Sequence, residues 1–224
     1  MPTSIEKIVA NFPFSTIPPI VGTPTYNTIA EVNLKINSNS SSVQSNHGCS
    51  TLGLLQLTGS PTLYNTLSSI AFIVPVNPGY VPIIPSNSTG TRITKLRYAF
   101  DTASILFNEY DRINKTLRQI LLYTVDKKFI HSLRHKYIRY ALTTTRAILD
   151  HLYTTYTNIS SADMQENDAV FRTPYDINQP IESLLDRVEN CGDYAADGNT
   201  PYSLKQDIDI AFHIVYQAGP FVYD

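Results

Sequence analysis

The sequence predicts an all-α protein, and two observations support this fold class. From Thr94 onward, apolar residues recur three and four positions apart, which is the spacing of one helix face. After residue 75, no segment alternates apolar and polar residues as a half-buried strand would. The apolar run LGLLQL (52–57) fits either class, so a short β-hairpin near 50–57 stays open.

Residues 1–24 contain five prolines, and their apolar residues follow no helical period, which predicts an extended arm. A purely solvated tail would not need Phe12, Phe14, Ile17 and Ile20. Two interpretations remain: a disordered tail, or an arm that docks these four side chains on a neighbouring subunit.

Two short helices are expected between residues 25 and 90. Thr25 is suited to cap the first, and Ser60 followed by Pro61 is typical of the start of the second. The polar stretch 38–48 is expected to be a loop, and the proline-rich stretch 75–90 an irregular connection. The expected inward residues are Ile29, Val32 and Ile36 in the first helix, and Leu63, Leu67 and Ile70 in the second.

The longest helical pattern begins at Thr94. It breaks near Asp126, which is suited to cap a new helix that starts at Lys127. Thr144 or Thr145 then caps the next helix. The apolar stripes of these helices are Leu96, Phe100, Ala103, Phe107, Tyr110, Leu117, Ile120, Leu121 and Val125, then Phe129, Ile130 and Leu133, then Ile148, Leu149, Leu152 and Tyr156.

Three further helices are expected after residue 160. The segment 161–163 opens the first, which runs towards Phe171, and Ser203 caps the last, which stops at 219–220. The stretch 193–199 is expected to be a loop. The expected inward stripes of the last two helices are Ile181, Leu184, Leu185 and Val188, and Leu204, Ile208, Phe212 and Val215.

Composition narrows the class of protein. Hydrophobic residues make up 42% of the 224 residues, enough to bury a core. A disulfide framework needs more cysteines than Cys49 and Cys191, and a zinc site needs clustered ligands, so we expect both cysteines to be reduced. The N-terminus lacks a signal-peptide pattern, and the apolar stretch 70–85 contains four prolines, which excludes a membrane helix there. We therefore expect a cytoplasmic protein that does not enter a membrane.

Charge is distributed unevenly along the chain. Residues 92–146 contain twelve Lys and Arg against four Asp and Glu, whereas residues 150–224 contain three basic and thirteen acidic residues. Such a chain is suited to pair head to tail with copies of itself. It is equally suited to present a basic face to one partner and an acidic face to another.

No arrangement of residues points to catalysis or to a metal. His131 and His135 would share one helix face, but a zinc site needs a third ligand. No G-x-S-x-G turn marks a nucleophile, and the nine glycines form no phosphate-binding loop. The acidic stretch 162–168 lacks the glycine and the terminal Glu of a calcium loop. We expect neither an enzyme nor a cofactor.

The segment DKKFIHSLRHKYIRYALTTTR (126–146) is the one ligand-binding signal in the sequence. It clusters cations on or near one predicted helix and interleaves them with tyrosines. This is either a solvated helix face, or a contact for a polyanion such as RNA or for the acidic half of a neighbouring copy. The residues expected in such a contact are Lys127, Lys128, Arg134, Lys136 and Arg139.

The last eighty residues follow a recognisable order: RAILDHLYTTYTN, a polar break, a helix, IESLLDRVENCGDYAADG, a last helix and QAGPFVYD. This order resembles the capsid region of Gag polyproteins from Copia-type long-terminal-repeat retrotransposons, and the upstream segments 23–46 and 52–79 also look like Gag segments. The residues that match the family pattern are Ala147, Leu149, Leu152, Tyr156, Ile181, Leu184, Leu185, Val188, Gly192, Ile208, Phe212, Val215, Pro220, Tyr223 and Asp224.

The resemblance implies a retrovirus-capsid-like protein with an N-terminal helical domain (25–157) and a C-terminal one (162–224). The hinge between them would consist of Asn158, Ile159, Ser160 and Ser161. Pentamers and hexamers of the chain would form a virus-like particle around the element's RNA in the cytoplasm. The sequence lacks the zinc knuckle that binds RNA in relatives. The alternative is a Gag-derived helical adaptor that binds a peptide in a groove and forms no shell.

Overall fold

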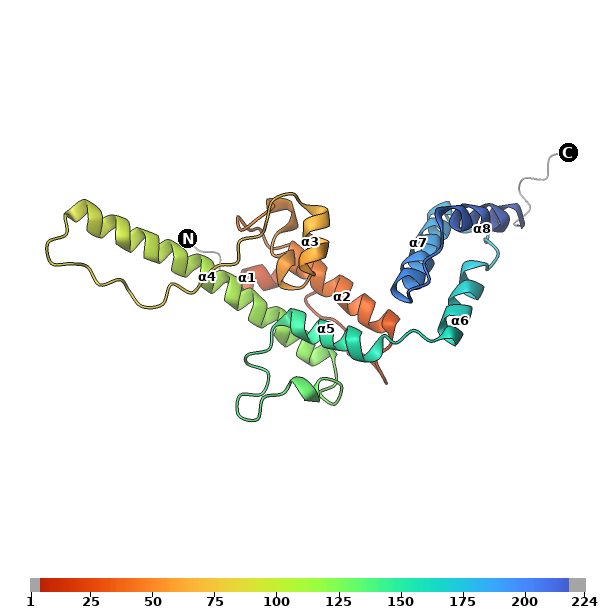
Figure 1. Cartoon of the computed structure of the whole chain (residues 1–224), viewed down its shortest axis with the longest axis horizontal. Helices are drawn as coiled ribbons and strands as arrows, with labels where there is room; N and C mark the ends of the chain where they lie inside the picture. Colours follow the sequence, from red (N-terminus) through yellow and green to blue (C-terminus); the bar gives the residue numbers. More distant parts are fainter. Residues whose placement is uncertain (1–4, 218–224) are drawn as a thin grey trace. The chain divides into compact units, whose positions relative to one another are not determined.

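The computed structural model describes residues 5–217 of the chain, and this range is all-α. It contains α1 (Ile5–Ala10), α2 (Tyr26–Ser41), α3 (Pro61–Leu67), α4 (Gly90–Thr124), α5 (Thr145–Tyr156), α6 (Ser161–Phe171), α7 (Ile181–Asp197) and α8 (Leu204–Gln217) (Figure 1).

Two short 3-10 helices occupy the region in which the sequence allowed a β-hairpin. They span Ser50–Leu52 and Leu55–Leu57, and the described residues contain no β-strand, so the hairpin near 50–57 is wrong. Gly53 lies between them with a φ of +52°, and its N–H donates to the carbonyl of Ser50. This left-handed residue turns the chain within a single step, so the apolar run coils locally and buries its leucines without pairing to a second strand.

The chain divides into two compact units, Met1–Tyr156 and Thr157–Asp224. The division falls next to the segment expected to be a hinge. Ser160 caps α6 by accepting the N–H of Asp163, and Ser161 is the first residue of that helix. The irregular link between α5 and α6 is therefore residues 157–160.

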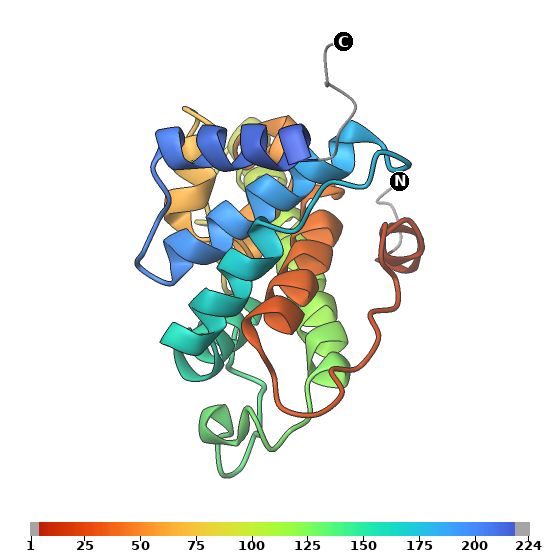
Figure 2. The same ribbon diagram turned by 90° about the vertical axis from the view of Figure 1, so that its right-hand side faces the viewer.

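Three helices of the first unit lie side by side: α2, α4 and α5 (Figure 2). Their buried side chains form one cluster, and the inward faces expected for α2 and α5 are confirmed. Thr25 caps α2 and Thr144 caps α5, whose Ala147 N–H donates to the Thr144 hydroxyl over 3.1 Å. The buried members of the cluster are Ile17, Ile29, Val32, Ile36, Leu121, Val125, Ile130, Tyr140, Ile148, Leu149 and Leu152.

Only the second half of α4 lies in the core. Its buried apolar residues are Ile113, Leu117 and Leu121, so the inward stripe expected from Leu96 to Phe107 is wrong. Those earlier side chains remain partly exposed. Figure 1 shows that the first half of α4 leads away from the rest of its unit, accompanied by the irregular chain that precedes it. This half of the helix therefore has too few neighbours to bury a stripe.

Helix α3 also turns a different face inward than expected. Ser60 caps it by accepting the N–H of Leu63, which confirms its start. Tyr64 is fully buried, whereas Leu63 and Leu67 are exposed. The Tyr64 hydroxyl accepts the N–H of Cys49 over 2.9 Å, and its ring meets Phe72 edge to face. A buried tyrosine with a satisfied hydroxyl thus replaces the leucine stripe.

The N-terminal arm packs on its own chain. Phe12 is buried with Leu54 and Leu117, and Ile17 is buried in the main cluster. The backbone of Phe14 exchanges two hydrogen bonds of 2.8 Å with the Asn39 side chain.

The arm is held at a further point, where the Ile20 N–H donates to the Thr124 carbonyl over 2.9 Å. Ile20 also packs on the main cluster. Docking of Phe12 and Ile17 on a neighbouring subunit is therefore corrected, because both are already buried within the unit. The wholly extended arm is corrected as well, since α1 occupies residues 5–10.

The second unit consists of α6, α7 and α8. Its core contains Phe171, Leu184, Cys191, Ile210 and Ile214. The helix expected to open at 161–163 is confirmed, whereas the loop expected at 193–199 is wrong, because α7 continues to Asp197.

The inward stripe expected for α8 is wrong, since Leu204, Ile208 and Phe212 are exposed. On α7 the same holds for Ile181 and Leu185. The expected stop at Gly219 and Pro220 lies outside the described residues.

A cap substitution tests the local argument for α2. The Thr25 hydroxyl accepts the Thr28 N–H, and the Thr28 hydroxyl in turn accepts the Thr25 N–H. Thr25→Ala removes one half of this capping box and is expected to lower the free energy of unfolding of the first unit by about 1 kcal/mol. Chemical denaturation measures the change. Thr23→Ala, an exposed site before Pro24, is the control, and an equal loss there would contradict the capping role.

Candidate functional site

The basic segment 126–146 is not the helix that the sequence predicts. After α4 ends at Thr124, the chain makes turns, a 3-10 helix at His131–Leu133 and a second turn before α5 begins. The Asp126 carboxylate does accept the Lys128 N–H over 3.1 Å, and this bond, with the nearby lysines, holds the pKa of Asp126 below its ordinary value. The expected cap at Asp126 therefore forms, but it caps a turn.

The second turn, residues 135–139, has Arg139 at its end and Arg134 directly before it. His135 and Arg139 exchange backbone hydrogen bonds of 2.8 and 3.0 Å, and the His135 Nδ1 accepts the Tyr137 N–H over 3.3 Å. Arg139 has a φ of +53°, a left-handed conformation that is uncommon for a residue with a side chain. Residues 136–138 form the exposed tip of this turn. Arg139 is part of the backbone pair that closes the turn, and Arg134 directly precedes that pair.

A cavity of about 700 Å³ lies between this segment and the last turns of α4. Arg118 ties the two sides together, because its Nη1 donates to the carbonyls of Ala141 (2.9 Å) and Thr143 (3.0 Å). The lining residues come from α4 and from 127–141, and they include cations, tyrosines and no Asp or Glu in the described part of the chain. They are Lys115, Arg118, Gln119, Leu122, Tyr123, Lys127, His131, Arg134, Arg139, Tyr140 and Ala141.

Three of the five expected contact residues line this basic cavity: Lys127, Arg134 and Arg139. The other two lie elsewhere. Lys128 is 3.5 Å from the Asp126 carboxylate and sits over the Phe129 ring, and Lys136 sits over the Tyr137 ring.

The contribution of α4 to this site was not predicted from the sequence. Lys115, Arg118 and Leu122 recur three and four positions apart, and so do Lys115, Gln119 and Tyr123 at steps of four, so these residues lie on one side of the helix. That spacing is a usable signal, but it points to a site only once the 127–141 segment is known to fold back over this face. Lys115 is paired with Asp111 on its own helix, which leaves the other cations to set the potential in the cavity.

The two histidines of the basic segment do not share a helix face. His131 lines the basic cavity, whereas the His135 ring accepts backbone N–H groups of its own turn. Within residues 5–217, no group of three or more His, Cys, Asp or Glu side chains is placed to hold a metal ion.

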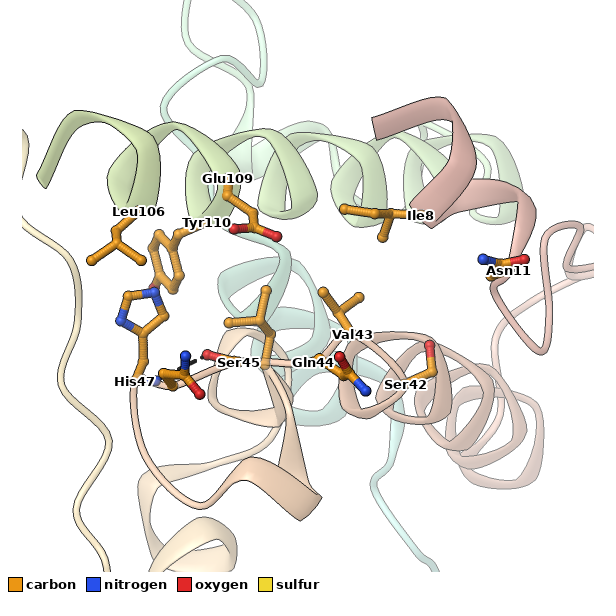
Figure 3. A pocket seen from close by; sticks show the side chains of 12 residues that line it. Ile8, Asn11, Ser42, Val43, Gln44, Ser45, His47, Leu106, Glu109 and Tyr110 are labelled. Carbon is orange, nitrogen blue, oxygen red and sulfur yellow. Dashed lines mark hydrogen bonds between the residues drawn. The ribbon is translucent and has the colours of Figure 1, made fainter. Parts of the chain in front are cut away.

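A second cavity, of about 510 Å³, lies between α1, α4 and the segment after α2. In Figure 3, Glu109 and Tyr110 come from α4 and face Ser45 and His47 across it, with Ile8 of α1 on the same side as α4. The His47 ring contacts Phe72 and Tyr110, with centroids 5.8 and 6.5 Å apart. Since α1 and this aromatic cluster enclose the space, we assign it to packing of the first unit.

His47 makes that cluster sensitive to pH. Burial lowers the pKa of His47 below its ordinary 6.5, and the Glu109 carboxylate opposes the effect only in part. A lowered pKa means that the folded state favours the neutral ring, so stability falls as the pH drops below 6.5. The His47→Gln variant is expected to lose part of this dependence in calorimetric melts. His131→Gln, at an exposed ring, should keep it, and equal behaviour of the two would contradict the role of His47.

Among residues 5–217, none of the helices combines the length and the apolar character needed to cross a bilayer. No protein-family model, no curated protein and no solved structure matches the chain.

Proposed function

We propose that the protein is a Gag-like capsid subunit that assembles with copies of itself into a shell around RNA. The observation that carries this proposal is the apolar stripe on α8. Leu204 is 75% exposed and Phe212 73% exposed, and Ile208 and Tyr216 lie on the same side of the helix at four-residue steps. An unbroken apolar stripe turned outward is typical of a surface that meets a partner.

The charges of the two units favour a second copy as that partner. The first unit contains fourteen Lys and Arg against seven Asp and Glu, and the second contains three against twelve. Copies of the chain therefore attract each other when the second unit of one meets the first unit of the next. Repeated contacts of this kind sum over many subunits, so each can be weak in isolation.

The resemblance to Copia-type Gag adds the closed form of the assembly. In that family, two helical domains joined by a short link build pentamers and hexamers of one particle. The described part of the second unit has its own core, with Phe171 and Leu184 among its buried residues, and residues 157–160 link it to the first unit. Such a subunit can keep its internal contacts while the angle at the link adapts to local curvature. The particle would reside in the cytoplasm.

Assembly is tested on the purified full chain. Light scattering across protein concentration and salt is expected to show large species, and negative-stain microscopy is expected to show rings or closed particles. Higher salt screens the attraction between acidic second units and basic first units, so particles that persist at high salt would assign their cohesion to the apolar stripe. A monomer under all conditions would refute the shell, and a stoichiometric complex with one bound protein in place of particles would favour the adaptor.

A further inference from the structure

We propose that the basic cavity binds an unpaired nucleotide of single-stranded RNA, with Lys127, Arg134 and Arg139 on the phosphates and Tyr123 under the base. The inference rests on the proposed function only in its choice of RNA as the polyanion. The cavity itself is defined by residues of the first unit and does not require assembly.

The charge of the lining selects an anion. Lys127, Arg134 and Arg139 are exposed at their side chains and reach the cavity from one folded-back segment. The described lining contains no carboxylate, and Asp126, which precedes Lys127 in the chain, lies outside the lining and is 3.5 Å from Lys128. Cations gathered on a concave surface attract phosphate more strongly than the same charges spread over a convex one.

The aromatic side chains separate a nucleotide from other anions. Tyr123 is 79% exposed at the last turn of α4, so its ring is available to a ligand, whereas Tyr140 is buried and forms part of the wall. An acidic peptide would use the cations but would gain little from an exposed ring. A base gains by stacking on it. A duplex keeps its bases stacked inside, so only an unpaired nucleotide can use both features.

Hydrogen bonds within and to residues 134–143 fix the backbone of this side of the basic cavity. Arg139 holds its left-handed conformation because two backbone bonds to His135 close the turn, and Arg118 pins the far end of the segment to α4. The backbone that carries the cations is therefore in place before any ligand arrives, which lowers the entropic cost of binding.

Binding is measured on the full chain by fluorescence anisotropy with a labelled single-stranded oligouridylate of eight nucleotides, at several salt concentrations. Lys127→Gln combined with Arg134→Gln is expected to reduce the slope of log affinity against log salt by about 1.4, which is roughly 0.7 for each lost phosphate contact. Lys128→Gln combined with Lys136→Gln removes the same charge from the same segment outside the cavity and should leave the slope unchanged.

Stacking is tested by a second matched pair. Tyr123→Ser is expected to weaken binding roughly tenfold. Tyr137→Ser, at a ring that is also 79% exposed but lies outside the cavity, should have no effect. Equal losses in the two members of either pair would overturn the proposal. So would equal affinity for duplex RNA, or for polyglutamate with no dependence on Tyr123.

Light scattering on the same variants separates this inference from the proposed function. Particles that persist after RNA binding is lost support the cavity as the RNA contact and leave the shell intact. RNA binding that shows the expected slopes in a chain without particles supports the cavity and refutes the shell. Particles with no measurable binding of the oligouridylate overturn the cavity proposal alone.

Discussion

Phe171→Ala is expected to unfold the second unit while the first unit stays folded. The Phe171 ring is fully buried in a small core, whose other buried members among the described residues are Leu184, Cys191, Ile210 and Ile214. Truncation of a buried Phe to Ala costs about 3–5 kcal/mol. A helical unit of this size has a total stability of about the same magnitude. The loss therefore consumes most or all of the stability of the second unit.

The two units have separate cores, so unfolding caused by Phe171→Ala is not expected to spread past residues 157–160 into the first unit. No residue of the cluster around Phe171 belongs to either cluster of the first unit, in the part of the chain that the structure describes. Hydrogen exchange measures the result helix by helix. Amides of α6, α7 and α8 should lose protection, and amides of α2 and α5 should keep it.

A matched control lies in the same unit. Phe212→Ala removes an equal side chain from an exposed position and should change stability by no more than about 0.5 kcal/mol. Loss of protection across both units in Phe171→Ala would show that they unfold as one. Unchanged protection in α6 to α8 would show that Phe171 does not hold the second core together.

The sequence predicts the start and the inward face of α2 and α5 well because each has one clear apolar face and a polar cap, although α2 runs to Ser41, into the stretch 38–48 expected to be a loop. Thr25 and Thr144 mark their starts, and the residues between follow the helical period. Helix α8 has apolar residues on two faces, one through Leu204 and Phe212 and another through Ile210 and Ile214. Periodicity finds both and cannot choose between them, since the choice depends on how α6 and α7 pack.

The basic segment shows how tertiary packing overrides a local pattern. Ile130 and Tyr140 are both buried in the main cluster of the first unit. A helix would set them about 15 Å apart along its axis, at a rise of about 1.5 Å per residue. A chain of turns brings both onto the same core, and the same turns carry Arg134 and Arg139 to the face of α4. The cations were therefore predictable as a cluster, whereas the cavity was not.

Ile208→Asp combined with Phe212→Asp is expected to abolish assembly and leave the second unit folded. The proposed shell requires the apolar stripe of α8 to be buried against a second copy, and a carboxylate there would have to lose its water shell. Loss of a central apolar contact typically costs 2 kcal/mol or more per interface, about a thirtyfold loss of affinity. A shell repeats that loss at every subunit, so the large species should vanish from light scattering.

The stripe variant needs a control for charge, because the second unit is already acidic. Gln165→Glu combined with Gln179→Glu adds the same two negative charges at exposed positions of that unit, outside α8. Particles should persist in this control if burial of the stripe drives assembly. If particles persist in the Ile208 and Phe212 variant, the apolar stripe of α8 is not part of the interface between copies. Particles lost in both variants would instead assign assembly to net charge, since like charges then repel across every contact between copies.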